Sequence, residues 1–390
     1  MAIKRRRGRG EGTLFKLPSG RWRAQITRDG KRESFGARTK EECQEWRRKM
    51  LFQIDNGLDL EGGRIQLEEW MEQWLEIVEP RLRPKTFYQY TRYSRLYIAP
   101  MLGDLKLKEL TPQRVQKFYG DLTRDGKSAY TVRHVHRILH LALDKAAQYG
   151  MIHANPAKGA VLPSLHKSEI RVLDADEVGK LLTAASGNRL EALFQLAVVT
   201  GMRQGELMGL KWSDVSWSSG TLHVQRQLQR VPGQGWTLIE PKTRAGRRIV
   251  SIGPGAIDAL RRQKERQNLE RAVAGKKWNE LGLIFANSVG NPMDAHNLRK
   301  AFIAVLKEAG LPEIRFHDLR HTAASLMLNH NVPLLAVSRM LGHANPSITL
   351  NTYAHLYNES LSLAGQVMDE LVTPVRVELT SVPVEAGRSG

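Results

Sequence analysis

The hydrophobic period of the chain changes near residue 65, and this change restricts the folds that the chain can adopt. Residues 21–28 alternate between apolar and polar side chains, whereas residues 67–78 carry apolar side chains three or four positions apart. A period of two is typical of a β-strand, and the wider spacing is typical of an amphipathic helix. With 390 residues, the chain is also long enough for two or three domains. We therefore predict a multidomain protein that begins with a small sheet and continues with a helical bundle.

The N-terminal segment, residues 1–60, is predicted to form a three-stranded sheet with one helix behind it. We expect strands at residues 13–17, 21–28 and 31–35, and Asp29-Gly30 is a typical two-residue hairpin turn. The face toward the helix would bury Trp22, Ile26 and Phe35. The opposite face would present Arg21, Arg23 and Gln25. Such a face can enter a DNA major groove, or it can simply be a solvated charged surface.

Residues 65–155 are predicted to form an all-helical bundle. Thr111 is a favourable N-cap for one of its helices, and residues 130–149 have the pattern of a long final helix. Basic side chains are spread over these helices and their ends. We expect three of them to contact the DNA backbone, namely Lys85, Arg133 and Arg137.

The overall charge points to a polyanionic partner. The chain has 59 Lys and Arg residues against 40 Asp and Glu residues, a formal net charge of +19. Because this excess is spread along the chain, nucleic acid is a better partner than a membrane surface. No apolar run approaches the ~18 residues that a membrane-spanning helix needs. We expect a cytoplasmic protein that binds DNA and no membrane.

Metal binding is not expected. His136 and His140 have the spacing of two metal ligands on one helix face, but the neighbouring residues are basic and no third ligand is evident. We interpret these histidines, with His134, as surface groups that face DNA. The single cysteine, Cys43, excludes a disulfide within the chain and a cysteine zinc cluster, as is typical of a reducing compartment.

A linker over residues 155–170 leads to a second globular unit, residues 171–372, which is predicted to be mixed α+β and mainly helical. One helix is expected to begin after Asp174 and another to end at Gly201. An antiparallel meander is expected from strands at residues 221–229, 236–240 and 248–252. An amphipathic stretch, residues 361–371, can pack on its own domain or on a neighbouring subunit. Residues 373–390 are expected to be a loose tail.

Five short motifs follow one another in the second unit, and each is weak alone. They are Thr200-Gly201-Met202-Arg203-Gln204-Gly205-Glu206-Leu207, Pro241-Lys242-Thr243-Arg244, His317-Asp318-Leu319-Arg320-His321-Thr322, Leu341-Gly342-His343 and Thr349-Leu350-Asn351-Thr352-Tyr353. In this order and spacing they resemble the tyrosine recombinase (phage integrase) family. The resemblance covers nearly the whole chain. It implies an arm-type DNA-binding domain at residues 1–60, a SAM-like core-binding domain at residues 65–155 and a catalytic domain at residues 171–372.

The resemblance also implies the site and the reaction. The implied catalytic residues are Arg203, Lys242, His317, Arg320, His343 and the nucleophile Tyr353, with Glu206 supporting the first arginine. DNA would be cleaved and rejoined through a 3′-phosphotyrosyl intermediate without a metal, a cofactor or ATP. The implied role is integration or excision of a mobile element such as a prophage or conjugative transposon. The implied partners are core and arm sites in double-stranded DNA, three further subunits of a homotetramer, and an accessory excisionase or DNA-bending protein.

These residue types suit phosphodiester chemistry. A tyrosine hydroxyl can attack phosphorus if its ionisation is assisted, and two guanidinium groups match two phosphate oxygens. Lys242, at a turn between two strands, can follow the leaving 5′-oxygen and protonate it. The sequence does not decide whether His317 or His343 takes the tyrosine proton. No Gly-rich phosphate loop and no acidic triad for Mg²⁺ stand out, which favours a reaction independent of ATP and metal.

Three residues within or near the motifs are expected to have structural roles, namely Asp318, His321 and Ser325. Two other functions share features with this interpretation. A DNA-binding regulator could keep the fold and lose the chemistry, but the set of catalytic residue types is complete. A type IB-like topoisomerase or a hairpin telomere resolvase would share the nucleophile, but the order and size of the three modules favour an integrase.

Overall fold

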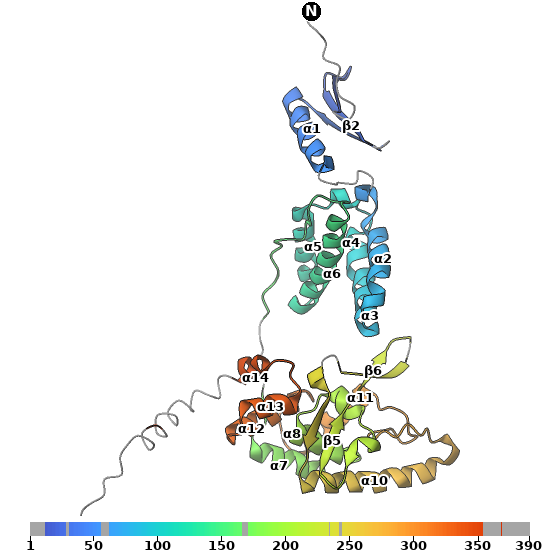
Figure 1. Ribbon diagram of the computed structural model, residues 1–390, viewed down its shortest axis with the longest axis vertical. Helices are drawn as coiled ribbons and strands as arrows, with labels where there is room; N and C mark the ends of the chain where they lie inside the picture. The colour runs from blue at the N-terminus through green and yellow to red at the C-terminus, as the bar shows by residue number, and fades with distance from the viewer. Residues whose placement is uncertain are drawn as a thin grey trace, which may run out of the picture. The chain divides into compact units, whose positions relative to one another are not determined.

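The computed structural model describes residues 12–28, 31–55, 62–165, 171–233, 235–241, 244–353 and 368 (Figure 1). The chain divides into two compact units, Met1–Ser168 and Glu169–Gly390. The first contains a small sheet and a helical bundle, and the second is mixed and mainly helical. No helix within the described residues is long and apolar enough to cross a membrane.

The first unit begins with an antiparallel sheet in the order β1-β2-β3, formed by Thr13–Lys16, Trp22–Arg28 and Lys31–Ala37. Helix α1, Lys40–Asp55, packs on β2 and β3. Ala24, Ala37 and Cys43 are buried between them, with Trp22 and Trp46 packed against them.

The prediction that Phe35 is buried is wrong. Phe35 pairs with Ala24 across the sheet, but it lies on the edge strand β3. Its ring stacks on Trp46 at a centroid distance of 5.6 Å and stays 38% exposed. The indole therefore covers one face of the ring, and among the described residues no further strand pairs with β3.

The rest of the first unit is the predicted helical bundle. Its helices are α2 (Leu67–Val78), α3 (Pro84–Tyr93), α4 (Ala99–Leu102), α5 (Pro112–Arg124) and α6 (Ala129–Gln148), with a π-helical turn at Ser94–Ile98. The apolar stripe of α2 faces inward, and the Trp70 indole donates to the Ala142 carbonyl of α6 over 3.0 Å. Thr111 caps α5 as expected, because its hydroxyl accepts from the Arg114 backbone N–H.

The second unit is built around a buried helix, α8 (Glu191–Thr200), which packs against α10 (Pro254–Ala274) and α12 (Asp318–Asn329). The other helices of this unit are α7 (Ala175–Ala184), α9 (Gln204–Met208), α10 (Pro254–Ala274), α11 (Ala295–Glu308), α12 (Asp318–Asn329), α13 (Leu334–Leu341) and α14 (Pro346–Tyr353). Asp174 caps α7, and Gly201 ends α8 at φ 61°, as the sequence predicts. The central helix thus ends at the first sequence motif.

The predicted meander is wrong in its connections. The strands are β4 (Val215–Ser216), β5 (Thr221–Val224), β6 (Gln227–Val231), β7 (Gly235–Ile239) and β8 (Arg248–Ser251). They form a sheet in the order β4-β5-β8 and a separate hairpin β6-β7. The expected strand at residues 221–229 is interrupted because the side chains of Gln225 and Arg226 turn to the buried carboxylate of Asp214. Strand β5 therefore pairs with β8 instead of β6.

Candidate active site

The turn between α8 and α9 positions the first arginine of the site. Arg203 is the N-cap of α9, and its backbone N–H and its Nη1 both donate to Glu206, over 3.0 and 2.9 Å. The Glu206 carboxylate is only 2% exposed, whereas the Arg203 side chain remains 38% exposed. One buried carboxylate thus holds a guanidinium that still reaches solvent.

Glu206 has a second cationic neighbour. Arg248, the first residue of β8, donates from Nη2 to the other carboxylate oxygen over 2.9 Å. Burial by itself raises the pKa of Glu206, but the Arg248 hydrogen bond and the charges of Arg248 and Arg203 outweigh it and hold this pKa below its usual value. Glu206 is therefore an anion between two cations at neutral pH.

The second arginine of the site comes from α12. Arg320 is 4% exposed, and its Nη1 donates to the Gly201 carbonyl over 2.8 Å. Its Nη2 is buried and has no hydrogen-bond partner within the described part of the chain. Burial, followed by the charge of Arg203, lowers the pKa of Arg320 to about 10. A buried guanidinium with an unused donor is a prepared site for an anion.

Tyr353 is the last residue of α14 and lies against α12. Its hydroxyl is 2.8 Å from Nδ1 of His321, and its side chain is only 4% exposed. Burial raises the pKa of this phenol to about 12, although the charge of Arg320 acts in the opposite direction. The His317 ring lies edge-on to His321, with centroids 5.6 Å apart. His317 is the N-cap of α12 and His321 lies in its first turn, and it is His321 that contacts the tyrosine hydroxyl.

His343 follows the end of α13. Gly342 ends this helix in the left-handed region at φ 70°, and the next residue turns back so that His343 N–H donates to the Ser338 carbonyl. Nδ1 of His343 is 2.7 Å from the buried Thr349 hydroxyl. Burial, followed by the charges of Arg320, Arg203 and Arg248, lowers the pKa of His343 to about 4. The ring is therefore neutral near pH 7.

The structure brings most of the predicted site residues together. The charge of Arg320 acts on His317, His343 and Tyr353, and the charge of Arg203 acts on Arg320, so these groups lie near one another. Lys242 lies outside the described residues, and so does most of the amphipathic stretch 361–371 and all of the tail 373–390. A cavity of about 580 Å³ lies between β8 and α13 and is lined in part by Arg248 and His343.

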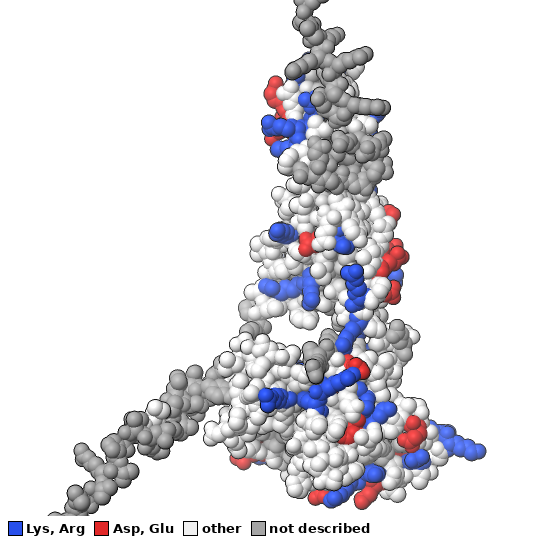
Figure 2. Space-filling model, in the orientation of Figure 1, with Lys and Arg blue, Asp and Glu red and all other residues white. Residues whose placement is uncertain are grey.

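The predicted DNA-binding residues differ in their surroundings. Arg21, Arg23, Lys85 and Arg137 are exposed, and Gln25 is half-buried. Arg133 instead donates from Nε to the carbonyl of Pro163 over 2.8 Å, so part of its guanidinium is already occupied. In Figure 2, acidic side chains gather along one flank of the bundle, and Lys and Arg side chains lie over other parts of the visible face.

The interpretation of His134 and His136 as surface groups is wrong. His136 Nδ1 is 3.0 Å from the Tyr119 hydroxyl, and the His134 ring lies edge-on to Tyr93. Both rings are half-buried because they pack against tyrosines of α3 and α5. Within the described ranges, no group of three or more His, Cys, Asp or Glu residues could hold a metal ion.

Two residues at the site were not expected there. His321 was interpreted as structural because only one face of its helix was expected to point at the site, but α14 brings the Tyr353 hydroxyl to the His321 ring. Arg248 lies 42 positions after Glu206, and no sequence spacing connects them. The sequence indicates only that two arginines, Arg247 and Arg248, stand at the start of a predicted strand. It does not indicate which of the two reaches the site.

Comparisons with known proteins show the family of this chain. A family model described as the phage integrase family matches residues 171–360, and one for the N-terminal SAM-like domain of phage integrases matches residues 66–123. A relative from Caldanaerobacter subterraneus subsp. tengcongensis, named a XerC-like tyrosine recombinase, is 34% identical over 359 residues. That match covers 87% of this chain and 92% of the relative.

Solved structures show the same fold. The Tn1549 transposon integrase, in complex with a circular intermediate DNA, superposes with a TM-score of 0.67 at 21% identity, covering 78% of this chain and 99% of the other. A lambda integrase tetramer bound to a Holliday junction gives a TM-score of 0.53 at 23% identity, covering 85% and 96%. From the fold, the family models and a relative that matches along most of both chains, we conclude that this protein belongs to the phage integrase family of tyrosine-type site-specific recombinases.

Proposed function

We propose that this recombinase cleaves one DNA strand at a time by attack of the Tyr353 hydroxyl on a phosphodiester. The Tyr353 oxygen forms a bond to phosphorus, the bond to the 5′-oxygen breaks, and a 3′-phosphotyrosyl ester remains. This ester conserves the energy of the broken bond, so that a 5′-hydroxyl can reverse the step without ATP. Attack by the 5′-hydroxyl of another duplex exchanges the strands and integrates or excises a mobile element.

The observation that carries this proposal is the unused donor of Arg320. Its Nη2 is buried without a partner within the described residues, while Nη1 is fixed to the Gly201 carbonyl. A phosphate oxygen would satisfy that donor, and Arg203 would bind the second oxygen. Two guanidinium groups held before the substrate arrives stabilise the charge that develops in the transition state. They supply the positive charge that a metal ion supplies in other nucleases, so no metal is needed.

The tyrosine proton has an acceptor within hydrogen-bond reach. With a pKa raised to about 12, Tyr353 is a neutral phenol at pH 7 and needs help to ionise. His321 Nδ1 is 2.8 Å from its hydroxyl, and burial lowers the pKa of His321, so the ring is neutral and has a nitrogen lone pair that can accept a proton. His321 takes the proton of Tyr353, His317 and His343 donate to the phosphate oxygens, and Lys242 protonates the leaving 5′-oxygen.

The remaining modules bring the DNA to this site. Residues 65–155 hold the core site through exposed basic residues, including Lys85 and Arg137. Residues 1–60 bind separate arm sites through the sheet face that carries Arg21, Arg23 and Gln25. Four copies assemble on two duplexes, because exchange of all four strands requires four active sites. An accessory excisionase or DNA-bending protein sets the direction of the reaction.

A nicked suicide duplex that contains the core site tests the proposal. The nick releases a short oligonucleotide after cleavage, so the covalent protein–DNA adduct accumulates. We expect the adduct with the wild type in the presence of EDTA and no adduct with Tyr353→Phe. Ser325→Ala, which removes another hydroxyl of the same unit, should keep the adduct. If Tyr353→Phe forms as much adduct as the wild type, the proposed nucleophile is wrong.

Two further measurements separate the related functions. A protein that only regulates would bind the core site without any adduct, and a topoisomerase would relax supercoiled plasmid without recombining two sites.

Lys242→Ala should slow cleavage of a normal substrate far more than cleavage of a 5′-bridging thio-substrate, since a thiolate leaves without a proton. Equal slowing of both substrates would contradict the assignment of Lys242 as the acid.

A further inference from the structure

We propose that Arg248 is a positioning residue that fixes Arg203 for catalysis and joins three segments of the active site. This inference rests on the proposed function, because it concerns how the phosphate-binding guanidinium is held. Arg248 is not among the residues that the sequence motifs indicate. Its side chain is only 7% exposed, although it carries a full charge.

The first of these contacts is to the carboxylate that holds Arg203. Arg248 Nη2 donates to Glu206 Oε2 over 2.9 Å, and Arg203 Nη1 donates to Glu206 Oε1 over 2.9 Å. Among the described residues, Glu206 is the one hydrogen-bond partner of the Arg203 side chain, which is 38% exposed. The orientation of Arg203 therefore depends on Glu206. The orientation of Glu206 depends in turn on Arg248.

The other two hydrogen bonds of Arg248 reach α13 and the connection that precedes β8. Arg248 Nε donates to the carbonyl of Met340 over 2.6 Å, three positions before His343. Its Nη1 donates to the carbonyl of Gly246 over 3.2 Å, in the connection between β7 and β8 that also contains Lys242. Gly342 packs against the same guanidinium so closely that a Cβ there would lie 2.8 Å from Arg248 Nη1. One side chain thus touches the segments that carry Arg203, His343 and Lys242.

These contacts distinguish Arg248 from a catalytic residue. Each of its three guanidinium nitrogens already has an acceptor within the protein, so the group is not set up to bind phosphate itself. Arg320 shows the opposite pattern, with one nitrogen left free. Arg248 must therefore act through Arg203 and its neighbours. A lysine at this position can keep one ion pair with Glu206 but cannot reach all three acceptors.

The experiment compares two substrates in the same nicked duplex, one with the normal scissile phosphodiester and one with a neutral methylphosphonate. Replacement of a charged non-bridging oxygen by a methyl group removes the need for one guanidinium. Arg248→Lys should slow adduct formation on the phosphodiester by about 100-fold, the usual effect of losing one preorganised donor. On the better methylphosphonate isomer, the slowing should be less than about threefold, and Arg203→Lys should give the same pattern. In the double variant the two effects should not add, because both act on one contact.

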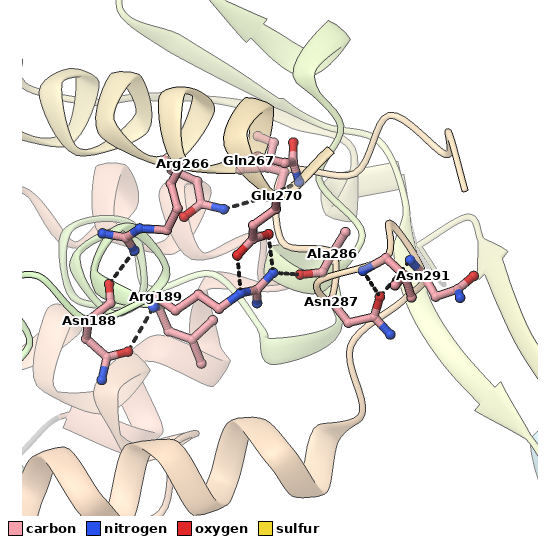
Figure 3. Close-up of polar contacts among 12 residues, drawn as sticks. Asn188, Arg189, Arg266, Gln267, Glu270, Ala286, Asn287 and Asn291 are labelled. Carbon is pink, nitrogen blue, oxygen red and sulfur yellow. Dashed lines mark hydrogen bonds and ion pairs between the residues drawn. The ribbon is translucent and has the colours of Figure 1, made fainter. Parts of the chain in front are cut away.

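A matched control uses another partly buried arginine of the same unit. Arg189 donates to both oxygens of Glu270 over 2.6 and 2.7 Å, and to the Ala286 carbonyl over 2.8 Å (Figure 3). Within the described ranges, its partners are Glu270 and Ala286, neither of which contacts the active-site residues. Arg189→Lys should lower the melting temperature of the full-length protein and slow both substrates to the same small extent. The comparison thus separates loss of folded protein from loss of phosphate recognition.

The possible results lead to distinct conclusions. If Arg248→Lys slows both substrates equally, or behaves like Arg189→Lys, Arg248 is only structural and the inference fails. If the wild type forms no adduct with a phosphodiester, the proposed function fails instead. If Arg248→Lys does not fold, Glu206→Gln takes its place, because it keeps the shape of the side chain and weakens the same connection. Equal slowing of both substrates by folded Glu206→Gln would also overturn the inference.

Discussion

Glu206 holds Arg203 and Arg248 in fixed positions before DNA binds. A carboxylate that is 2% exposed would be strongly unfavourable alone, and two guanidinium groups compensate for it. Removal of one partner of a buried ion pair lowers the free energy of unfolding by about 3–5 kcal/mol, because it leaves the other charge buried without compensation. The same arrangement keeps Arg203 extended toward solvent. The stability of the domain and the readiness of the site thus depend on the same three side chains.

The contact between His321 and Tyr353 can be tested by removing the ring nitrogen of the histidine. His321→Phe keeps the ring but removes Nδ1, so the Tyr353 hydroxyl loses its hydrogen-bond partner at 2.8 Å. We expect adduct formation to slow by about 100-fold, the usual contribution of general base catalysis, with DNA affinity unchanged. The measurement is single-turnover cleavage together with a binding titration. The same change at His296, which is exposed on α11, is the control. A rate within twofold of the wild type would show that His321 is not the proton acceptor.

Individual site residues were predictable only where a motif contains them. Arg203, His317, Arg320, His343 and Tyr353 were predicted because they stand in motifs whose order and spacing resemble those of a known family. The partnership of Arg248 with Glu206 was not predictable, since it joins two segments through space. The contact of His321 depends on the angle at which α14 meets α12, which no local pattern determines.

At the scale of elements, the end of α8 positions two parts of the site. Gly201 adopts φ 61°, and a Cβ there would lie 2.5 Å from Leu341 Cδ2 and 3.3 Å from Ala323 Cβ. Its carbonyl also accepts the hydrogen bond from Arg320. Only a residue without a side chain allows α12 and α13 to approach this turn so closely.

Gly201→Ala should therefore destabilise the protein. The left-handed backbone costs about 1–2 kcal/mol for a non-glycine residue, and overpacking against Leu341 adds about 1–3 kcal/mol. Denaturant unfolding measures the change. The control is Gly179→Ala in the interior of α7, where a Cβ would meet nothing within 4 Å, and a gain of about 0.5–1 kcal/mol is expected. Equal effects of the two substitutions would contradict the role of the Gly201 turn.

Helices and strands were predictable to different extents. The stripe on α2, the caps of α5 and α7 and the end of α8 depend on local patterns, and the structure has them. The pairing of β5 with β8 was not predictable, because the interruption at Arg226 depends on a buried carboxylate that the chain brings from Asp214. Alternation identifies a strand, but it does not identify the neighbour of that strand.

At the scale of the whole molecule, histidines that are partly shielded from solvent make stability depend on pH. Burial lowers the pKa values of five of them, namely His134, His136, His317, His321 and His343. The folded state therefore favours neutral rings, whereas unfolded histidines bind protons near pH 6.5. Above about pH 6.5 the histidines are neutral in both states and do not favour unfolding. As the pH falls from there toward about 4, the pKa of His343, protonation of the unfolded chain lowers the free energy of unfolding.

We expect the melting temperature of the DNA-free protein to fall steadily between about pH 6.5 and pH 4.5. Over this range His343→Asn should show a shallower decline than the wild type, because one titrating ring has been removed. Calorimetry at several pH values measures both curves. His296→Asn, which changes an exposed histidine, should keep the slope of the wild type. A melting temperature that stays constant over this range would contradict the account.

The modular organisation predicts separable activities. Deletion of residues 1–56 removes the sheet and α1 but leaves the bundle and the second unit, which have their own cores. The shortened protein should still form the covalent adduct on a core-site duplex, at a rate within about threefold of the full chain. Integration between full attachment sites should be severely impaired, because arm sites would no longer be bound. Unchanged integration would show that the N-terminal sheet is not an arm-binding module.

Identification of the residue that becomes linked to DNA decides whether Tyr353 is the nucleophile. The wild-type protein is reacted with the nicked core-site duplex, the DNA is trimmed with nuclease, and the modified peptide is sequenced by mass spectrometry. We predict a nucleotide that is joined through its 3′-phosphate to the Tyr353 oxygen. A modification on any other residue, or an active protein that recombines DNA without a covalent intermediate, would contradict this prediction.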